Sequence, residues 1–472
     1  MPFFLSLDCG LTVCKAAVFD ENGNRLGERR EATPLRGFRM DSAARWASAA
    51  RCVREALAAS SVAAGEIAAV GLSGHGNGLY ALDGAGECFL AVSSMFNENQ
   101  QDVDAFRESE AYAEYFARTS QSCWGGQPLQ ILRRLKKTAP GEYARVRRVL
   151  FCKDYLRCRL TGEIATDYSD FSAGALCADD DYLRLMGVPE LSGALPLPVR
   201  CDEIAARVSA EAARQTGLLA GTPVAGGGID LFCCMQGAGV TEPGVTSVTM
   251  GTWGIAAGYA PQLSDLAPLT QKCDFLPGLP PVAVVSGPTS CVNLDWFLRA
   301  VRPELTYDEA NAVASSFAPG DVKALYLPYL YRDMARPRVA AGFANLAPGD
   351  TWREMLRAVY EGVCFSHRLQ CERLARAGVQ SRRIRLSGGA TNSETWRRLV
   401  CDILKVPLEI PQEKQAGLLG AAMMAAVGAG VYPSLREAGR AMFRAERAYE
   451  PRPDAAYDEK YAQFKEMVGE KE

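Results

Sequence analysis

A carboxylate that follows three consecutive glycines is the strongest chemical feature of the sequence. Gly226, Gly227 and Gly228 end a short apolar run, and Asp230 stands at the expected start of an apolar helix. Glycine allows close approach to the backbone, so this carboxylate could lie beside a small substrate and accept a proton from it. Asp is also a common helix N-cap. Both a catalytic and a capping role are therefore open for Asp230.

Two short hairpins could bind an anion through backbone N–H groups. Residues 5–20, LSLDCGLTVCKAAVFD, turn at Gly10, with Asp8 and Thr12 around the tip. A second hairpin turns at Gly251 and Thr252, within SVTMGTWGIAAGY. Successive N–H groups at such tips suit phosphate oxygens, although many glycine-tipped hairpins are only turns. The recurrence of this device in both halves of the chain suggests a duplication.

Length and composition limit the class of protein. With 472 residues, the chain is long enough for two domains, which we place at 1–241 and 242–472. A net charge of −3 with scattered arginines argues against nucleic acid as a partner. No export segment or bilayer-spanning stretch is recognisable, so we expect a cytoplasmic protein without a membrane partner. Only two histidines are present, which excludes a three-histidine zinc site.

Hydrophobic periodicity indicates alternating strands and helices around these features. We expect a helix over residues 41–60, a buried strand over 67–73 and an exposed His75 in the glycine-rich turn that follows. Residues 98–160 look helical, with arginines and lysines on solvated faces, and 161–200 look like an irregular loop crossing a cleft. A helix is expected over 205–216.

The second half predicts strands at 282–286, 324–327 and 383–386. Its longest helix, over 351–376, carries His367 on the apolar stripe, which favours a hydrogen-bonded core histidine. Gly388 and Gly389 precede a further helix, for which we expect a capping box from Thr391 to Glu394.

Taken together, these motifs resemble the FGGY family of carbohydrate kinases over nearly the whole chain. Besides the glycine devices, the segments KDYLRCRLTGEIATDYSD (153–170) and YEGVCFSH (360–367) are similar to family text. SGHGNGLYALD and the MGTW turn look most like those of L-xylulose and 3-keto-L-gulonate kinases. The resemblance implies an α/β fold of two related actin-like, ribonuclease H-like ATPase domains with a cleft between them. The N-terminal domain would hold the sugar and a phosphate loop, and the C-terminal domain the nucleotide.

The resemblance also implies roles for individual residues. Asp230 would be the general base that takes the proton from the sugar hydroxyl. The implied sugar-binding residues are His75, Gly76, Asn77, Glu98 and Asp230; the implied ATP-binding residues are Gly10, Thr12, Lys15, Gly251, Thr252, Gly388, Gly389 and Asn392; and Asp8 with Asp230 would place Mg²⁺. ATP and Mg²⁺ are thus the expected cofactors, and a homodimer is the expected assembly.

Two departures from the family pattern bear on function. Leu11 and Val13 stand where the family usually has hydroxyl residues, so phosphate binding at these two positions would depend on backbone N–H groups. The arginine usual after the acidic sugar-loop residue is absent, because Asn99 and Gln100 follow Glu98, so a neutral sugar is favoured over a sugar acid. The resulting prediction is an ATP-dependent kinase for a ketopentose of the L-xylulose type. A polyol kinase of the erythritol or glycerol type, and a nucleotide-binding sensor without kinase activity, are the alternatives.

Overall fold

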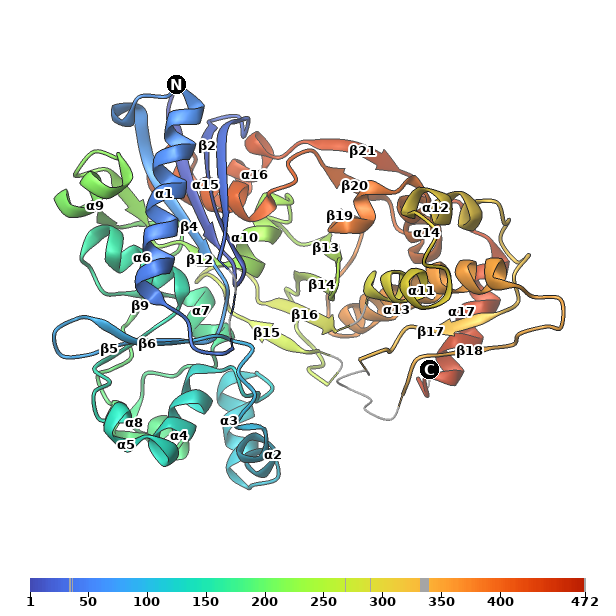
Figure 1. Cartoon of the computed structure of the whole chain (residues 1–472), viewed down its shortest axis with the longest axis horizontal. Coiled ribbons are helices and arrows are strands. Elements are labelled where there is room, and N and C mark those ends of the chain that lie inside the picture. The colour runs from blue at the N-terminus through green and yellow to red at the C-terminus, as the bar shows by residue number, and fades with distance from the viewer. Residues whose placement is uncertain (34, 36, 268, 289, 332–338, 471–472) are drawn as a thin grey trace. The chain divides into compact units, whose positions relative to one another are not determined.

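The chain forms two compact units. The computed structural model describes residues 1–470 except 34, 36, 268, 289 and 332–338 (Figure 1). Unit 1 consists of Met1–Thr241, Gln271–Pro281 and Gln415–Phe443, and unit 2 of Glu242–Thr270, Val282–Lys414 and Arg444–Glu472. The division of the chain into an N-terminal domain, 1–241, and a C-terminal domain, 242–472, stays a prediction. No helix among the described residues is long and apolar enough to span a membrane.

The main sheet of unit 1 has the strand order β10-β11-β4-β1-β2-β3, and β12 also pairs with β4. β1 is antiparallel to β2 and parallel to β4, so the first hairpin lies beside a strand that runs in the same direction as β1. The strands are β1 (Phe3–Cys9), β2 (Val13–Asp20), β3 (Arg25–Ala32), β4 (Ile67–Gly74), β10 (Ile204–Arg207), β11 (Pro223–Ala225) and β12 (Gly228–Ile229).

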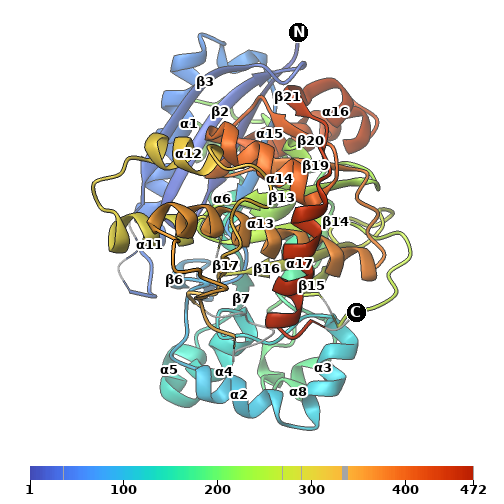
Figure 2. The ribbon, with the colours of Figure 1, turned by 90° about the vertical axis from the view of Figure 1, so that its right-hand side faces the viewer.

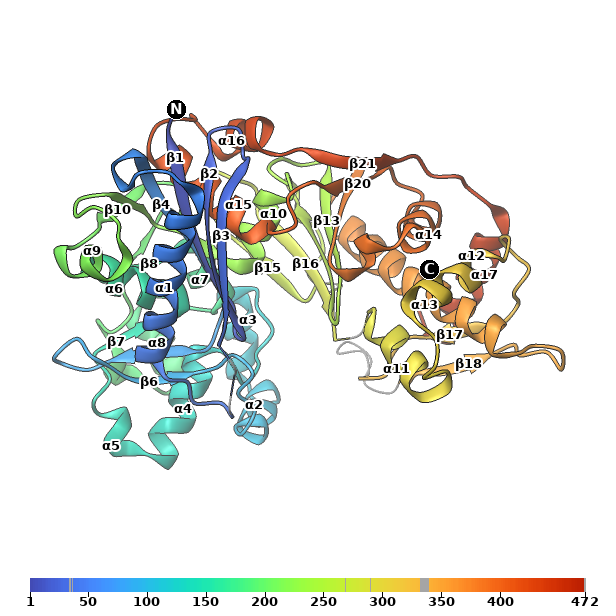
Figure 3. The same cartoon turned by 45° about the horizontal axis from the view of Figure 1, so that its top comes forward.

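Helices cover both faces of this sheet, as Figure 3 shows for α1 on one side and α10 and α15 on the other. Helix α1 (Ser42–Ser60) begins where Asp41 accepts a hydrogen bond from the Ala44 N–H, and it packs on β2 and β3. Helix α15 (Ala416–Gly428) packs on β1 and β4 and against α10 (Asp230–Gly237). Its small residues allow this close packing: a Cβ on Gly420 would come within 1.9 Å of the Cys233 carbonyl oxygen.

A smaller α/β part of unit 1 surrounds the sheet β6-β5-β7. Its core contains Leu79, Phe106, Tyr115 and Leu132. The remaining elements of unit 1 are β5 (Leu79–Leu82), β6 (Cys88–Val92), α2 (Gln100–Arg107), α3 (Ala111–Thr119), α4 (Pro128–Thr138), α5 (Pro140–Tyr143), β7 (Arg148–Leu150), α6 (Cys152–Thr161), β8 (Thr166–Asp167), α7 (Tyr168–Ala173), α8 (Asp180–Leu185), β9 (Pro198–Val199), α9 (Ala210–Thr216), β15 (Gln271–Cys273) and α16 (Leu435–Met442).

Unit 2 is built around the strand order β16-β14-β13-β19-β20-β21. Its longest helix, α13, begins with a capping box between Thr351 and Glu354 and contacts both β14 and α17, which is red in Figure 2. The elements are β13 (Val245–Met250), β14 (Gly254–Tyr259), β16 (Val282–Gly287), α11 (Val292–Val301), α12 (Tyr307–Ser315), β17 (Leu325–Leu327), β18 (Gly342–Ala344), α13 (Trp352–Arg376), β19 (Arg383–Ser387), α14 (Glu394–Leu404), β20 (Leu408–Pro411), β21 (Ala445–Tyr449) and α17 (Ala455–Met467).

The two main sheets repeat one pairing pattern. In unit 1, β1 is antiparallel to β2 and parallel to β4; in unit 2, β13 is antiparallel to β14 and parallel to β19. The pattern continues outward, because β11 and β20 are both parallel to the strand inside them, and β10 and β21 are both antiparallel to the strand next to them. This shared topology agrees with the duplication that the hairpins suggested.

Several local predictions are wrong. Residues 161–200 are not one irregular loop, because they contain β8, α7, α8 and β9. The helix expected over 205–216 is replaced by β10 up to Arg207 and by α9 from Ala210, where Ser209 caps the helix through its hydroxyl. The helix after Gly388 and Gly389 is capped by Ser393 instead of Thr391, because residues 389–392 form a short 3-10 turn first.

Candidate active site

The ends of two parallel strands bring Asp8 into a polar corner of unit 1. Asp8 lies near the end of β1, where its Oδ1 accepts a 2.8 Å hydrogen bond from the hydroxyl of Ser73 on β4. Its Oδ2 lies 3.9 Å from Nζ of Lys15 on β2. A Cβ on Gly417, in the first turn of α15, would be 3.2 Å from the same Oδ2. The Asp8 carboxylate therefore lies close to the Lys15 ammonium and to the first turn of α15.

Asp230 is the first residue of α10, and the residue before it, Ile229, stands in the cap position without a side-chain cap. Asp230 is therefore not the N-cap of α10. Asp230 Oδ1 accepts the Leu231 N–H over 2.7 Å. Desolvation, followed by the negative charge of Asp8, raises the pKa of Asp230 to about 7, although N–H groups of Leu231 and Gly76 act in the opposite direction. A carboxylate with this pKa is well suited to accept a proton near neutral pH.

Arg45 of α1 organises the tip of the first hairpin. Its guanidinium donates to the carbonyl oxygens of Gly10, over 2.7 Å, and Leu11, over 3.0 Å. A 2.9 Å hydrogen bond from the Gly10 N–H to the Val13 carbonyl oxygen closes the turn. Thr12, within this turn, is exposed. Sequence reasoning missed Arg45, although an arginine on the apolar stripe of a helix is a usable signal of a buried polar role.

The turn after β4 is buried, so the exposed position predicted for His75 is wrong. His75 is 3 % exposed, and its Nε2 lies 3.4 Å from the hydroxyl of buried Tyr80. Asn77 is 5 % exposed and adopts a left-handed φ of 58°. Among the described residues, neither Nδ1 of His75 nor Oδ1 of Asn77 has a hydrogen-bond partner. Buried polar atoms usually have partners, and these two are free to bind a polar ligand.

The loop that carries Glu98 is connected to this turn through two glycines. The Gly78 N–H donates to the Gly126 carbonyl oxygen over 2.8 Å, and Asn99 Nδ2 donates to the Gly125 carbonyl oxygen over 3.0 Å. A Cβ on Gly126 would come within 2.0 Å of the Ser94 carbonyl oxygen, so the three segments are closely packed. Glu98 is exposed and lines a cavity of about 480 Å³ together with Arg39, Phe96 and Arg134, among others. No direct contact joins Glu98 to His75 among the described residues.

In unit 2, the two glycine turns lie at the same end of the paired strands β13 and β19. The hydroxyls of Thr249 and Ser387 are 2.9 Å apart just before the turns. Gly388 has a φ of 91°, and a Cβ there would come within 2.3 Å of the Met250 carbonyl oxygen, so only glycine fits without strain. The turn residues predicted to bind ATP are partly or fully exposed: Gly251, Thr252, Gly388, Gly389 and Asn392.

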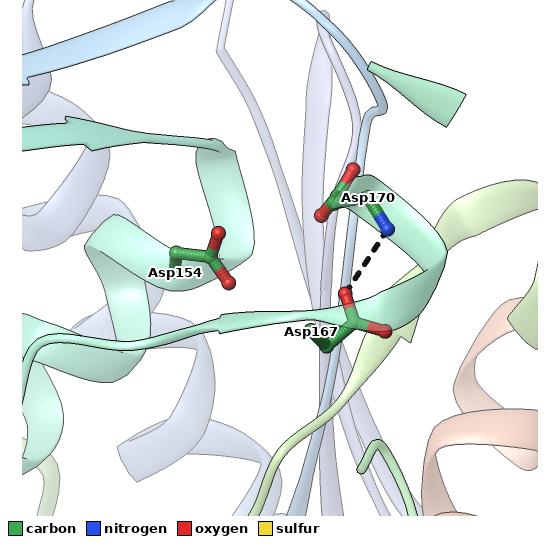
Figure 4. A group of neighbouring side chains, drawn as sticks. All are labelled: Asp154, Asp167 and Asp170. Atoms are coloured by element: carbon green, nitrogen blue, oxygen red, sulfur yellow. Dashed lines mark hydrogen bonds between the residues drawn. The ribbon is translucent and has the colours of Figure 1, made fainter. Parts of the chain in front are cut away.

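Unit 1 also contains a second cluster of acidic residues, which the sequence analysis did not predict. Asp154, Asp167 and Asp170 point toward one another (Figure 4), and their carboxylate oxygens lie close enough for a metal ion. All three are buried, together with Lys153 and Arg157. The prediction that the basic residues of this stretch lie on solvated faces is therefore wrong for Lys153 and Arg157. The sequence signal for this group is the occurrence of Lys153, Asp154, Asp167 and Asp170 within one short segment.

His367 lies in the core of unit 2, as its place on the apolar stripe predicted. It is 1 % exposed, and its Nε2 is 2.8 Å from the Ser290 hydroxyl. Burial lowers the pKa of His367 to about 4, so the imidazole is neutral at physiological pH.

Comparisons with known proteins show which family the chain belongs to. The model of the N-terminal domain of the FGGY family of carbohydrate kinases matches residues 3–237, and that of the C-terminal domain matches 283–429. The chain is 31% identical over 487 aligned residues to an L-xylulose/3-keto-L-gulonate kinase of Escherichia coli, covering 99% of this chain and 96% of the relative. A probable L-xylulose kinase of Haemophilus influenzae is 30% identical, with 90% of each chain covered.

Solved structures support the same fold. The xylulose kinase of Rhodospirillum rubrum matches with a TM-score of 0.90 at 22% identity, covering 99% of this chain and 98% of that one. A Plasmodium falciparum glycerol kinase matches with a TM-score of 0.87 at 15% identity, covering 99% and 97%. The predicted α/β fold is confirmed, as is the predicted resemblance. The chain therefore belongs to the FGGY family of carbohydrate kinases, and it is a sugar kinase with ATP as its phosphoryl donor.

Proposed function

We propose that this kinase phosphorylates a hydroxyl of a neutral ketopentose of the L-xylulose type, with Asp230 as the general base. The observation that carries the proposal is the carboxylate of Asp230, which follows three glycines, lies next to Asp8 and has a pKa raised to about 7. The names of the relatives at 30% and 31% identity support the choice of sugar. The missing arginine after Glu98 favours a neutral ketose over 3-keto-L-gulonate.

The roles of the surrounding residues follow from their chemistry. His75 and Asn77 each have a buried polar atom without a partner and would bind sugar hydroxyls together with Gly76 and Glu98. In unit 1, the tip at Gly10 and Thr12 and the ammonium of Lys15 would bind phosphate oxygens. In unit 2, Gly251 and Thr252 would bind the γ-phosphate, and Gly388, Gly389 and Asn392 the adenosine.

Two carboxylates fit the magnesium ion that accompanies ATP in such kinases. Mg²⁺ prefers carboxylate and phosphate oxygens, and Asp8 and Asp230 supply carboxylates close enough for the charge of one to shift the pKa of the other. When bound, the ion neutralises developing charge on the phosphate oxygens. The residues of the chain orient the sugar hydroxyl and accept its proton at the Asp230 carboxylate. A homodimer and a cytoplasmic location remain predictions.

The test is ADP release with ATP and Mg²⁺ across L-xylulose, D-xylulose, L-ribulose, D-ribulose, 3-keto-L-gulonate, erythritol and glycerol. We expect the highest kcat/KM for L-xylulose. A preference for erythritol or glycerol would replace the ketose proposal by the polyol alternative, to which an erythritol kinase of Brucella abortus, 26% identical, lends some weight. ATP turnover that no sugar stimulates would favour the sensor alternative.

The role of Asp230 is tested separately with Asp230→Asn, which keeps the shape and removes the base. We expect kcat to fall by about 10²-fold or more. Asp104→Asn, on the surface helix α2, is the matched control and should retain activity, because the Asp104 side chain contacts only exposed partners, Arg107 and Gln100, among the described residues. Undiminished turnover by folded Asp230→Asn would remove Asp230 as the base.

A further inference from the structure

The three buried aspartates of unit 1 surround a lysine ammonium. Nζ of Lys153 lies 2.6 Å from Asp154 Oδ1, 2.7 Å from Asp167 Oδ1 and 2.8 Å from Asp170 Oδ2, and all four side chains are fully buried. The ammonium donates a hydrogen bond to Asp154 Oδ1 and forms ion pairs with the carboxylates of Asp167 and Asp170. The position that would suit a metal ion between the carboxylates of Figure 4 is therefore taken by the chain's own cation.

The Lys153 cluster contains three buried carboxyl groups and two buried cations. Arg157 supplies the second cation, with Nη2 3.2 Å from Asp154 Oδ1. Burial raises the pKa of the Asp170 carboxyl well above its usual range. A buried network of this kind is rigid, because each member has lost its water and depends on its partners.

The cluster reaches the backbone that leads to Asp230 at two points. The Ser169 hydroxyl donates to Asp167 Oδ2 over 2.6 Å and accepts the Ile229 N–H over 2.8 Å. Arg157 Nη1 donates to the Gly226 carbonyl oxygen. These bonds attach to the first and last residues of the segment 226–229, and the next residue is Asp230.

This segment needs external support because of its composition. Gly226, Gly227 and Gly228 have no side chains, and Gly227 has a φ of 74°, so the isolated backbone would be unusually free. A displacement of a catalytic group by about 1 Å can cost about 10²-fold in rate. A base that follows three glycines therefore depends on what holds those glycines.

We propose that Ser169 is a positioning residue for phosphoryl transfer: its hydroxyl connects the Lys153 cluster to the Ile229 N–H and thereby fixes the carboxylate of Asp230. The inference rests on the proposed role of Asp230 as the base. Ser169 does not touch the reacting atoms in this scheme, and it acts only through the backbone of Ile229.

The first test compares Ser169→Ala and Ser169→Cys with Ser172→Ala. Ser172 is the matched control, because it lies on the same helix α7 but its hydroxyl accepts the Asp274 N–H instead. We expect kcat to fall about tenfold or more in Ser169→Ala, with KM for ATP changed less than about twofold, while Ser169→Cys, whose thiol is a weaker hydrogen-bonding group, keeps an intermediate kcat. Ser172→Ala should match the unsubstituted enzyme. An unchanged kcat in folded Ser169→Ala would overturn the inference, and if that variant does not fold, an unchanged kcat in Ser169→Cys would do so.

The second test asks whether Ser169 acts through Asp230. In Asp230→Asn the base is gone, so adding Ser169→Ala should not reduce the residual kcat further. If kcat of the double variant falls by the product of the factors for the two single variants, Ser169 acts independently of Asp230. That result would overturn the inference and leave Asp230 as the base. Full activity of Asp230→Asn alone would instead overturn the proposed base, and the positioning role with it.

Discussion

The guanidinium of Arg45 donates to the Gly10 carbonyl oxygen over 2.7 Å, from a helix to the turn of the first hairpin. Arg45 is 5 % exposed, and its second contact at the tip is the Leu11 carbonyl oxygen. The two carbonyl groups therefore face the helix side of the hairpin. The two hydrogen bonds hold the tip in place. Because residue 11 is leucine, its side chain has no hydroxyl group that could bind a phosphate.

Replacing Arg45 by Met should weaken ATP binding, because the tip loses both hydrogen bonds. We expect the KM for ATP to rise about tenfold, equivalent to ~1.4 kcal/mol, with the KM for sugar little changed. Initial rates over a range of ATP concentrations measure this. Arg51→Met on the same helix is the control, since Arg51 pairs only with exposed Glu31, and its KM should stay the same. Equal KM values for the two variants would contradict a role for Arg45 at the tip.

Removing the Lys153 ammonium should destabilise unit 1 strongly. Lys153→Met leaves the carboxylate of Asp167 buried without a cation and that of Asp154 with Arg157 alone, and such a loss costs about 3–5 kcal/mol. Lys137→Met, which breaks an exposed pair with Asp102, should cost less than about 1 kcal/mol. Urea denaturation of both variants gives the two free energies of unfolding. A cost for Lys153→Met as small as that for Lys137→Met would show that the cluster adjusts without its lysine.

A methyl group between α10 and α15 should disturb both stability and activity. Gly420→Ala places a Cβ 1.9 Å from the Cys233 carbonyl oxygen, so the helices must separate, at a cost of about 1–3 kcal/mol. Because α10 begins at Asp230, kcat should fall as well. Gly141→Ala in α5, where a Cβ meets nothing within 4 Å, is the control. Thermal unfolding and turnover are measured for both, and a stable, fully active Gly420→Ala would mean that the position of α10 is not critical.

His367 should make unit 2 less stable in mild acid. Burial lowers its pKa to about 4 from the usual value near 6.5, so the unfolded chain takes up a proton before the folded one does. Stability from this group is complete above pH 6.5 and is lost as pH falls from 6.5 to 4, up to about 3 kcal/mol. His367→Gln cannot titrate. The difference in unfolding free energy between the two proteins should therefore shrink between pH 7 and pH 4.5, and a constant difference would refute the shift.

Local signals in the sequence predicted those parts of the fold that depend on neighbouring residues. Helix α1 begins directly after Asp41, and helix α13 directly after Thr351, close to the starts that the sequence predicted. Both glycine-tipped hairpins form, because turn chemistry and alternating apolar residues act over short distances.

Long-range partners were harder to foresee. Glycines flank His75 and suggested exposure, but the imidazole is buried beside Tyr80. Lys153 looked like part of a solvated face because its three carboxylate partners come from α6, β8 and α7, which only the folded chain brings together. The roles of the individual site residues stay predictions, since their chemistry depends on ligands that have to be bound to be seen.

Helix α15 packs on β1, on β4 and on α10, yet it comes from the last part of the chain. A ribosome that adds about 5–20 residues per second needs roughly ten to thirty seconds between residue 241 and residue 415. During this interval the nascent sheet lacks the helix that covers one of its faces, and the backbone around Asp8 and Asp230 has no final support. A chain stalled before residue 415 would therefore expose apolar surface that α15 covers in the complete protein, and such surface makes a nascent chain prone to aggregation.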